Sequence, residues 1–304
     1  MKTSKKRYVG NVRELKVYGK ILELIRIVYE ITESLPEFEQ YNLGAVFRRS
    51  STSMLANLSE GNTNYYYKKE YNHLNMVLGK IGECRSALDI CKTVGYISDA
   101  IYLNADLKCE EILKMMIGMM RRIESYLESI QDTHNKTEMI DKSYIDPDTL
   151  AIVYEKATIF NNLISKVVLK LPRYEEEIMK DQMVRAAKSV LQNLTNSNSC
   201  STSQLYLAFN TSLGSISESI AFCDVAVLQS YISNEQYDSL FTLGSEIKDS
   251  LINLMNQAVQ INNEETEEVY CKPEFKKIAH LLARTSNSRI PLNFLGFTAS
   301  LFPA

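Results

Sequence analysis

Two sets of polar side chains have the residue types and spacing that acid–base chemistry requires. In the first set, Arg49, Ser53 and Asn57 recur every four residues, which places them on one strip of a helix. Glu83, in a following helix, could meet this strip, and a carboxylate beside an Arg and an Asn is found in catalytic pairs. The second set repeats the same residue types as Arg185, Ser189, Asn193 and Glu218.

Structural roles for both sets are favoured over catalysis. Neither set is accompanied in the sequence by a nucleophile or by a cluster of metal ligands. The histidines (His73, His134 and His280) are far apart, and none has a second His or Cys at the spacing of a helical metal site. The sequence also lacks GxGxxG and GxxxxGK[ST] phosphate loops. We therefore predict two structural polar networks, no metal, no cofactor and no enzymatic activity.

A third group of residues combines aromatic rings with positive charge. Three consecutive tyrosines precede Lys68 and Lys69, and aromatic rings can stack on bases while ammonium groups neutralise phosphates. The alternative is a turn whose tyrosines cover one end of a helical bundle. The candidate nucleic-acid-binding set is Arg48, Tyr65, Tyr66, Tyr67, Lys68 and Lys69.

The polar sets recur because the chain contains an internal repeat. A shift of 136 residues superimposes residues 49–58 on residues 185–194, with the Arg, Ser, Leu, Asn and Leu positions matched. A shift of 135 residues then aligns Leu78, Gly79 and Glu83 with Leu213, Gly214 and Glu218. So many matches in one register indicate a duplication.

Apolar residues at three- and four-residue steps predict four helices in each copy. In the first copy, Gly61 is predicted to end the second helix and Gly95 the third, because glycine adopts the left-handed conformation at a helix end. The fourth helix is predicted over about 98–128, with Leu103, Leu107, Leu113 and Met120 on its apolar face. The helices of the second copy are predicted at about 148–170, 174–195, 202–228 and 233–260.

The predicted fold is all-α, with two tandem antiparallel four-helix bundles and a C-terminal extension. The predicted boundaries are residues 1–135 for the first bundle, 136–147 for a linker, 148–262 for the second bundle and 263–304 for the extension. The extension is expected to contain a short helix near 273–284 and an apolar tail. We expect this tail to dock on the chain itself or on a partner.

Composition narrows the classes of function. The 304 residues carry a net charge of -3, whereas dedicated nucleic-acid binders are usually basic. The six cysteines lack CxxC spacing, and we expect them to be reduced core residues. No apolar run reaches the roughly 18 residues of a membrane span, so we expect a cytoplasmic protein that does not insert into membranes.

The segment 53–61 (SMLANLSEG), followed by Lys68-Lys69-Glu70-Tyr71 and by Leu78-Gly79 with Glu83, resembles a bacterial four-helix-bundle family. That family is encoded within intervening sequences of large-subunit ribosomal RNA genes. The segment is also similar to the accessory variability determinant of diversity-generating retroelements. The resemblance covers residues 12–125 and, more weakly, 150–258.

The resemblance implies a non-enzymatic bundle that often assembles into a ring of five. The retroelement members bind a reverse transcriptase and its template RNA through basic surface. This chain departs from the pattern at Leu55, where the family usually has proline, and at residues 62–67, which replace an Arg-rich stretch. In the second copy, Asn196-Ser197 replaces Glu60-Gly61, which disfavours RNA binding by that copy.

Two functional hypotheses follow. The first is an accessory scaffold of a retroelement or a related mobile or defence system, which binds a reverse-transcriptase-type partner and RNA through the first bundle. The alternative is a protein-only structural adaptor with two diverged docking faces. A homo-oligomer is also expected if the family ring is retained, and the first bundle would then build the ring.

Overall fold

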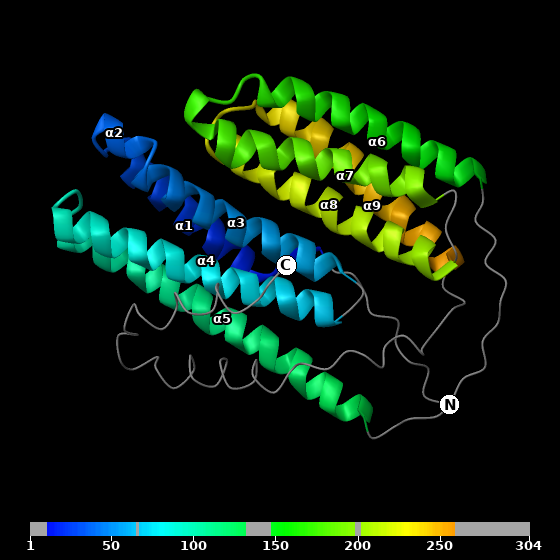
Figure 1. Ribbon diagram of the computed structural model, residues 1–304, viewed down its shortest axis with the longest axis horizontal. Helices are drawn as coiled ribbons and strands as arrows, with labels where there is room; N and C mark the ends of the chain where they lie inside the picture. The colour runs from blue at the N-terminus through cyan, green and yellow to red at the C-terminus, as the bar shows by residue number, and fades with distance from the viewer. Residues whose placement is uncertain (1–10, 65–66, 132–146, 198–201, 259–304) are drawn as a thin grey trace.

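The described part of the chain is helical throughout. The computed structural model describes residues 11–64, 67–131, 147–197 and 202–258, and no strand occurs among them. Their long helices form two antiparallel four-helix bundles that lie side by side (Figure 1). The predicted all-α fold with two bundles is therefore confirmed. The predicted C-terminal extension, its short helix and its tail lie outside the described residues.

The first bundle follows the predicted order of helices. Gly95 has a φ of +83° and ends the third long helix, as predicted, because a residue without a Cβ adopts this conformation at low cost. A 3-10 turn (Val12–Glu14) precedes the bundle, and the one-turn helix α2 (Glu37–Gln40) follows the first long helix. The long helices are α1 (Lys16–Glu33), α3 (Leu43–Thr63), α4 (Tyr67–Val94) and α5 (Asp99–Gln131).

The prediction that Gly61 ends the second helix is wrong. Helix α3 continues to Thr63, and Gly61 is buried within it. A Cβ atom at this position would lie 2.7 Å from the Cβ of His73 on α4. Glycine therefore allows two neighbouring helices to approach closely, a packing role that is not distinguishable from a cap by sequence alone.

The core face of α5 also differs from the prediction. Leu103 and Leu107 were expected on that face, but they are 57% and 54% exposed. The buried face is instead formed by smaller and more C-terminal side chains, including Ala105, Cys109 and Ile112. The apolar pattern of the first turns is therefore displaced from the face that packs against α1 and α4.

The second bundle has the same order of long helices, but different turns precede its second long helix. The sequence predicts one helix from about residue 174, whereas the structure has a 3-10 turn (Arg173–Glu175) and a π-helical turn (Glu176–Lys180) there. Such turns change the direction of the chain and the side chains that face a neighbour. The long helices are α6 (Pro147–Val168), α7 (Asp181–Ser197), α8 (Thr202–Leu228) and α9 (Asn234–Ala258).

The two bundles share one junction, in which α3 of the first packs along α8 of the second (Figure 1). The buried apolar residues consequently form a continuous cluster that runs through both bundles. Helix α8 is covered by α7, α9 and α3. Its residues 206–228 are long and apolar enough to cross a membrane, contrary to the sequence expectation, but 78% of that window is buried in the protein. Burial on several sides explains this composition.

The described cysteines are buried and unbridged. Cys84, Cys91, Cys109 and Cys223 are free thiols in the core. Burial raises the pKa of Cys109 to about 12, so this thiol stays protonated at neutral pH. The expectation of reduced core cysteines is met at these four positions, whereas Cys200 and Cys271 lie outside the described residues.

Candidate functional site

Arg48 lies inside the junction between the bundles. Its side chain is 3% exposed, and its Nε is 3.7 Å from Oε1 of Glu175, which is fully buried. Its Nη2 donates a hydrogen bond to the carbonyl oxygen of Gln40 at 2.9 Å, and its guanidinium lies 4.7 Å from the ring centre of Tyr174. A phosphate at the surface cannot reach this side chain. The assignment of Arg48 to the nucleic-acid-binding set is therefore wrong.

Glu175 belongs to a buried polar cluster in which some hydrogen-bonding atoms have no partner. Its Oε1 accepts a hydrogen bond from the Tyr231 hydroxyl at 3.4 Å, whereas its Oε2 and the Tyr29 hydroxyl are buried without hydrogen-bond partners. Burial raises the pKa of Glu175, and the neighbouring Tyr29, Arg48 and Tyr231 oppose this rise. The cluster joins α1 and α3 of the first bundle to the turn before α7 and the turn after α8.

A second buried cluster surrounds Asp224 of α8. This carboxylate accepts hydrogen bonds from Arg13, Tyr18 and Tyr237, with 3.0 Å to Arg13 Nε and 2.7 Å to the Tyr237 hydroxyl. The cluster connects the N-terminal turn, α1, α8 and α9. Sequence reasoning missed it, although α8 offered a signal: Glu218 and Asp224 are its acidic residues, and it contains no Lys or Arg.

The polar network predicted for the first copy is only partly present. Arg49 is exposed and donates a hydrogen bond at 3.2 Å to the carbonyl oxygen of Glu177 in the second bundle. Asn57 donates to the carbonyl oxygen of Ser53 at 2.9 Å, and its Oδ1 lies 3.3 Å from Nδ1 of His73. Arg49 therefore forms a hydrogen bond across the junction, and Asn57 connects α3 to α4.

Glu83 does not join Arg49 and Asn57, which corrects the predicted network. It accepts hydrogen bonds from Ser50 Oγ at 2.8 Å and from Lys80 Nζ at 2.7 Å, and its side chain is 45% exposed. The reason is geometric, because Glu83 lies on the outer side of α4.

We expect Glu83→Ala to lower the free energy of unfolding by less than about 1 kcal/mol, the usual limit for an exposed ion pair. Ser50 would keep its second hydrogen bond, 2.8 Å to the carbonyl oxygen of Val46, so no buried donor is left without an acceptor. The measurement is the midpoint of urea denaturation, with the buried Glu175→Ala as a comparison. A loss above about 2 kcal/mol would show that Glu83 has a buried partner.

In the second copy, Arg185, Ser189 and Glu218 line a cavity, and Asn193 follows Ser189 on α7. Ser215 Oγ donates to Ser189 Oγ at 2.8 Å, and Asn193 Nδ2 donates to the carbonyl oxygen of Ser189 at 2.7 Å. Arg185 is exposed and its Nε lies 2.9 Å from Oδ2 of Asp181. These contacts form a local network. Its carboxylate, Glu218, lines a cavity to which the first bundle contributes Glu60.

The cavity measures about 240 Å³ and lies where α3 meets α7 and α8. Burial raises the pKa of Glu218 to about 8, the negative charge of Glu60 adds to this rise, and Arg185 opposes it. Close approach of α3 is possible because a Cβ at Gly214 would lie 2.9 Å from Cγ of Glu60. The polar side chains that line the cavity are those of Glu60, Gln182, Arg185, Ser189, Thr211, Ser215 and Glu218.

Glu60 is shared by both bundles. His73 Nε2 lies 3.6 Å from its Oε1, and burial lowers the pKa of this histidine while Glu60 raises it. Farther along the junction, Asn210 donates a hydrogen bond to Asn64 at 2.8 Å. Among the described residues, no group of three or more His, Cys, Asp or Glu side chains is placed to hold a metal ion.

The predicted tyrosine and lysine set is placed at the start of α4. Tyr67 is half-buried, and its ring centre lies 4.5 Å from that of Tyr126 on α5. Lys68 is exposed, whereas Lys69 is half-buried and has a pKa lowered by burial. Tyr65 and Tyr66 lie outside the described residues. The structure thus brings Tyr67, Lys68 and Lys69 together and leaves Arg48 in the junction.

Comparisons with known proteins agree with the repeat. A sequence profile of the 23S rRNA-intervening sequence protein family matches residues 13–118 and 150–253, once in each bundle. A solved structure from Bacteroides thetaiotaomicron, a protein of unknown function from the S23 ribosomal protein family, is 23% identical. It covers 36% of this chain and 98% of its own, with a TM-score of 0.34. The comparison with curated proteins gives no significant match.

Proposed function

Because the chain belongs to the 23S rRNA-intervening sequence protein family and carries two copies of its bundle, we propose a non-enzymatic scaffold that docks a helix of a different protein. The docking surface is the outer side of α4, here called the α4 face. It consists of Met76, Gly79, Glu83, Ile90 and Val94. The observation that carries the proposal is the asymmetry of the junction, in which α3 covers α8 while no helix among the described residues covers the equivalent surface of α4.

Equivalent positions on α8 and α4 differ in what covers them. Gly214 on α8 receives Glu60 of α3, whereas a Cβ at the equivalent Gly79 would meet no atom within 4 Å. Val225 on α8 is fully buried, whereas the equivalent Ile90 on α4 is 48% exposed. The duplication has therefore retained a helix-binding surface on α4 for which the described residues supply no helix.

The α4 face has the character of a helix-binding surface. Met76, Ile90 and Val94 are 51%, 48% and 57% exposed, and they follow one side of the helix. Exposed apolar strips of this kind mark interaction sites, and a helix is recognised through side chains at such spacing. Gly79 in the middle lets a partner helix approach closely, as Gly214 does in the junction.

A different protein fits the α4 face better than a second copy of this chain. In a second molecule of this chain, α3 already packs against α8, so the helix that could take its place on the α4 face is α7, the equivalent of α3 in the second bundle. Thr52 and Ala56 are buried, and their spacing places them on the same strip of α3 as Arg49 and Glu60, which contact the second bundle. Their equivalents on α7 are Lys188 and Gln192, which are exposed and much longer. These side chains would prevent α7 from repeating the close contact that α3 makes.

The test compares two substitutions at one position. Gly79→Ala should fold normally and gain up to about 1 kcal/mol, since alanine favours a helix interior over glycine. Gly79→Arg should also fold but block the α4 face. We expect a protein captured from the native host by the wild type and by Gly79→Ala to be lost by Gly79→Arg. Hydrogen exchange with the purified partner should then protect residues 72–94.

Two results would oppose this function. Equal capture by Gly79→Arg and the wild type would place the docking surface elsewhere. A wild-type chain that assembles with itself, and becomes a monomer on Gly79→Arg substitution, would show by light scattering that the occupant is a second copy.

The basic residues at the start of α4 favour a second candidate. This candidate is a cytoplasmic accessory factor of a retroelement or of a related mobile or defence system, with a reverse-transcriptase-type partner and RNA. Lys68 is exposed there, beside the paired rings of Tyr67 and Tyr126. The support is this juxtaposition together with the resemblance to the retroelement accessory proteins. A reverse-transcriptase gene beside the gene for this chain would strengthen it.

RNA binding through this surface is expected to be weak and salt-sensitive. With Arg48 in the junction, Lys68 and Lys69 neutralise about one or two phosphates, so the logarithmic salt slope should have a magnitude of about 1 to 2. Lys68→Glu/Lys69→Glu should abolish binding, and Lys166→Glu/Lys170→Glu on the second bundle should leave it unchanged. A slope magnitude above about 4 would require a larger basic surface.

A further inference from the structure

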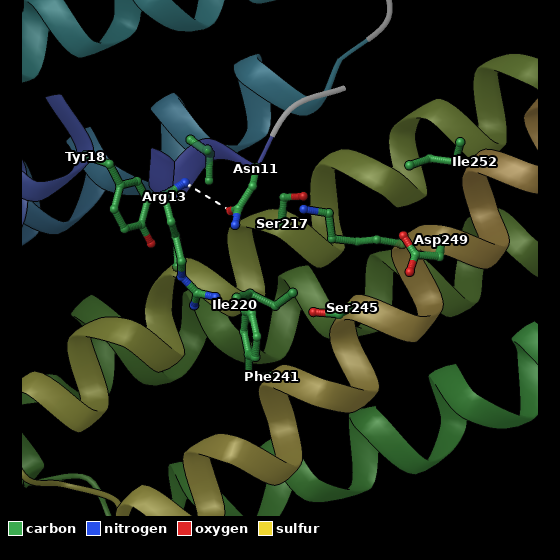
Figure 2. Close-up of a pocket in the computed structure, with 12 residues that line it drawn as sticks. Asn11, Arg13, Tyr18, Ser217, Ile220, Phe241, Ser245, Asp249 and Ile252 are labelled. Carbon is green, nitrogen blue, oxygen red and sulfur yellow. Dashed lines mark hydrogen bonds between the residues drawn. The ribbon is translucent and has the colours of Figure 1, made fainter. Parts of the chain in front are cut away.

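A cavity of about 190 Å³ lies where the N-terminal turn of the first bundle meets α8 and α9 of the second (Figure 2). Figure 2 shows Arg13 and Tyr18 on one side of it, and Ser217 of α8 and Ser245 of α9 on the other. None of the described residues that line it belongs to α4. This cavity is therefore separate from the α4 face and from the cavity around Glu218.

Ser217 is the first sign that the cavity is built for a polar ligand. Its side chain is 3% exposed, and its Oγ has no hydrogen-bond partner in the structure. Buried hydroxyl groups nearly always have a partner, so an unpaired one on a cavity wall indicates a binding position for a polar group. Asn11 lies across from it in Figure 2, with its Oδ1 accepting a hydrogen bond from the Arg13 backbone N–H at 3.1 Å.

Lys248 of α9 is the second sign. It is half-buried, lines the cavity, and forms no ion pair or hydrogen bond with the part of the chain that the structure describes. Burial and the positive charge of Arg13 lower its pKa, and Asp249 partly opposes this effect. An anion that enters the cavity would therefore stabilise the charged form of Lys248.

The other cation at the cavity is already neutralised. Arg13 Nε lies 3.0 Å from Oδ2 of Asp224, and a second nitrogen of the same guanidinium also donates to this carboxylate. Tyr18 and Tyr237 donate to Asp224 as well. Lys248 is therefore the described cation that lines the cavity without an ion pair, and Asp249, which also lines the cavity, offsets its charge in part.

The remaining wall is partly apolar, and Asn11, Ser245 and Asp249 add polar groups to it. Val12, Ile220, Phe241 and Ile252 line the cavity from the N-terminal turn, α8 and α9. Figure 2 shows Phe241 and Ile220 close together on the side of Arg13. A ligand that fits this wall needs an apolar part in addition to its charge.

We propose that this cavity binds a small organic carboxylate, held by Lys248 Nζ and Ser217 Oγ, with its apolar part against Ile220, Phe241 and Ile252. A monocarboxylate matches the single available cation, whereas a phosphate dianion would bring a second charge into a half-apolar cavity. The carboxylate belongs either to a free small molecule or to the C-terminus of a peptide. A bound ligand would contact both bundles and thereby stabilise their junction.

Isothermal titration of the full chain provides the test. The probes are 4-methylpentanoate, 4-methylpentanamide, acetate and inorganic phosphate, with acetyl-glycyl-glycyl-leucine as the peptide source. We expect 4-methylpentanoate to bind at least about tenfold more tightly than the amide, because its charged group meets Lys248. It should also bind about tenfold more tightly than acetate, because of the added apolar area. Tighter binding of the peptide would identify a C-terminus as the source.

Variants separate this site from non-specific binding. Lys248→Met should weaken 4-methylpentanoate binding by about tenfold or more, and Ser217→Ala by about threefold to tenfold. Lys166→Met, at an exposed lysine on α6, is the matched control and should have no effect. Binding at alkaline pH should also take up protons, since an anion favours the charged form of a lysine with a lowered pKa. Arg13 and Asp249 are the charged groups that act on this lysine.

The proposal is overturned if the amide binds as tightly as the acid. It is also overturned if Lys248→Met and Lys166→Met bind the acid equally, or if neither the acid nor the peptide binds at 20 mM or below. Phosphate binding in preference to the carboxylate would contradict the charge argument. Should Lys248→Met fail to fold, the comparison of acid with amide on the wild type decides the result.

Discussion

Arg48→Ala is expected to lower the free energy of unfolding by about 3 to 5 kcal/mol, the usual loss when one partner of a buried ion pair is removed. Arg48 is 3% exposed and faces the fully buried Glu175, whose pKa is already raised by burial. Without the guanidinium, this carboxylate would be buried beside Tyr29 and Tyr231 and would lose its ion-pair partner, with Lys180 as the remaining positive charge that acts on it. Urea denaturation of the full chain at pH 7 measures the loss.

The neighbouring arginine is a matched control for this prediction. Arg49 is exposed and donates to one carbonyl oxygen, so Arg49→Ala should cost about 1 kcal/mol or less. Replacing both members of the buried pair, as in Arg48→Met/Glu175→Leu, should recover most of the loss, because two apolar side chains leave no charge without a partner. Equal effects of Arg48→Ala and Arg49→Ala would contradict the buried pair.

The free energy of unfolding is expected to fall as pH rises from about 4.5 to about 8, and Glu218 is the cause. In the folded chain its pKa is raised from 4.5 to about 8, so the folded state holds a proton that the unfolded state has lost. Stability therefore decreases with rising pH across this window. A tenfold change in proton affinity corresponds to about 1.4 kcal/mol, and we expect roughly 2 to 4 kcal/mol in total because water reaches the cavity.

Glu218→Gln should remove the part of this dependence that Glu218 causes. The variant should match the wild type near pH 5 and exceed its stability by roughly 2 to 4 kcal/mol near pH 8.5. Glu60→Gln should lower the pKa of Glu218, since Glu60 contributes to the rise. Glu83→Gln, at the equivalent exposed position of the first bundle, should leave the profile unchanged. A difference between Glu218→Gln and wild type that stays constant from pH 5 to 8.5 would show that Glu218 is ionised throughout.

The two copies of the bundle have equivalent residues in different environments. Glu83 is exposed on α4, whereas Glu218 lies in the junction and has a raised pKa. Gly79 faces open space, whereas Gly214 accommodates Glu60. In the second bundle this surface packs against α3, whereas in the first bundle the described residues place no helix on it. This difference is the physical basis of the proposed scaffold function.

The local features of the fold could be predicted from the sequence. Apolar periodicity gave two sets of four helices, and the match between residues 49–58 and 185–194 gave the duplication. Gly95 was predicted to end α4 because a left-handed residue at a helix end is a local requirement. These features depend on neighbours within a few residues, so the order of side chains along the chain determines them.

The candidate sites required the tertiary structure. Sequence reasoning placed Arg48 on the surface and Glu83 in a network, whereas the structure buries Arg48 against Glu175 and leaves Glu83 on the outer side of α4. Periodicity identifies the apolar face that each helix turns to its own bundle. The junction uses a second face of α3 and α8, whose polar residues resemble surface residues in the sequence. Only the packing of one bundle against the other decides which of these residues lose contact with water, and this loss sets their partners and pKa values.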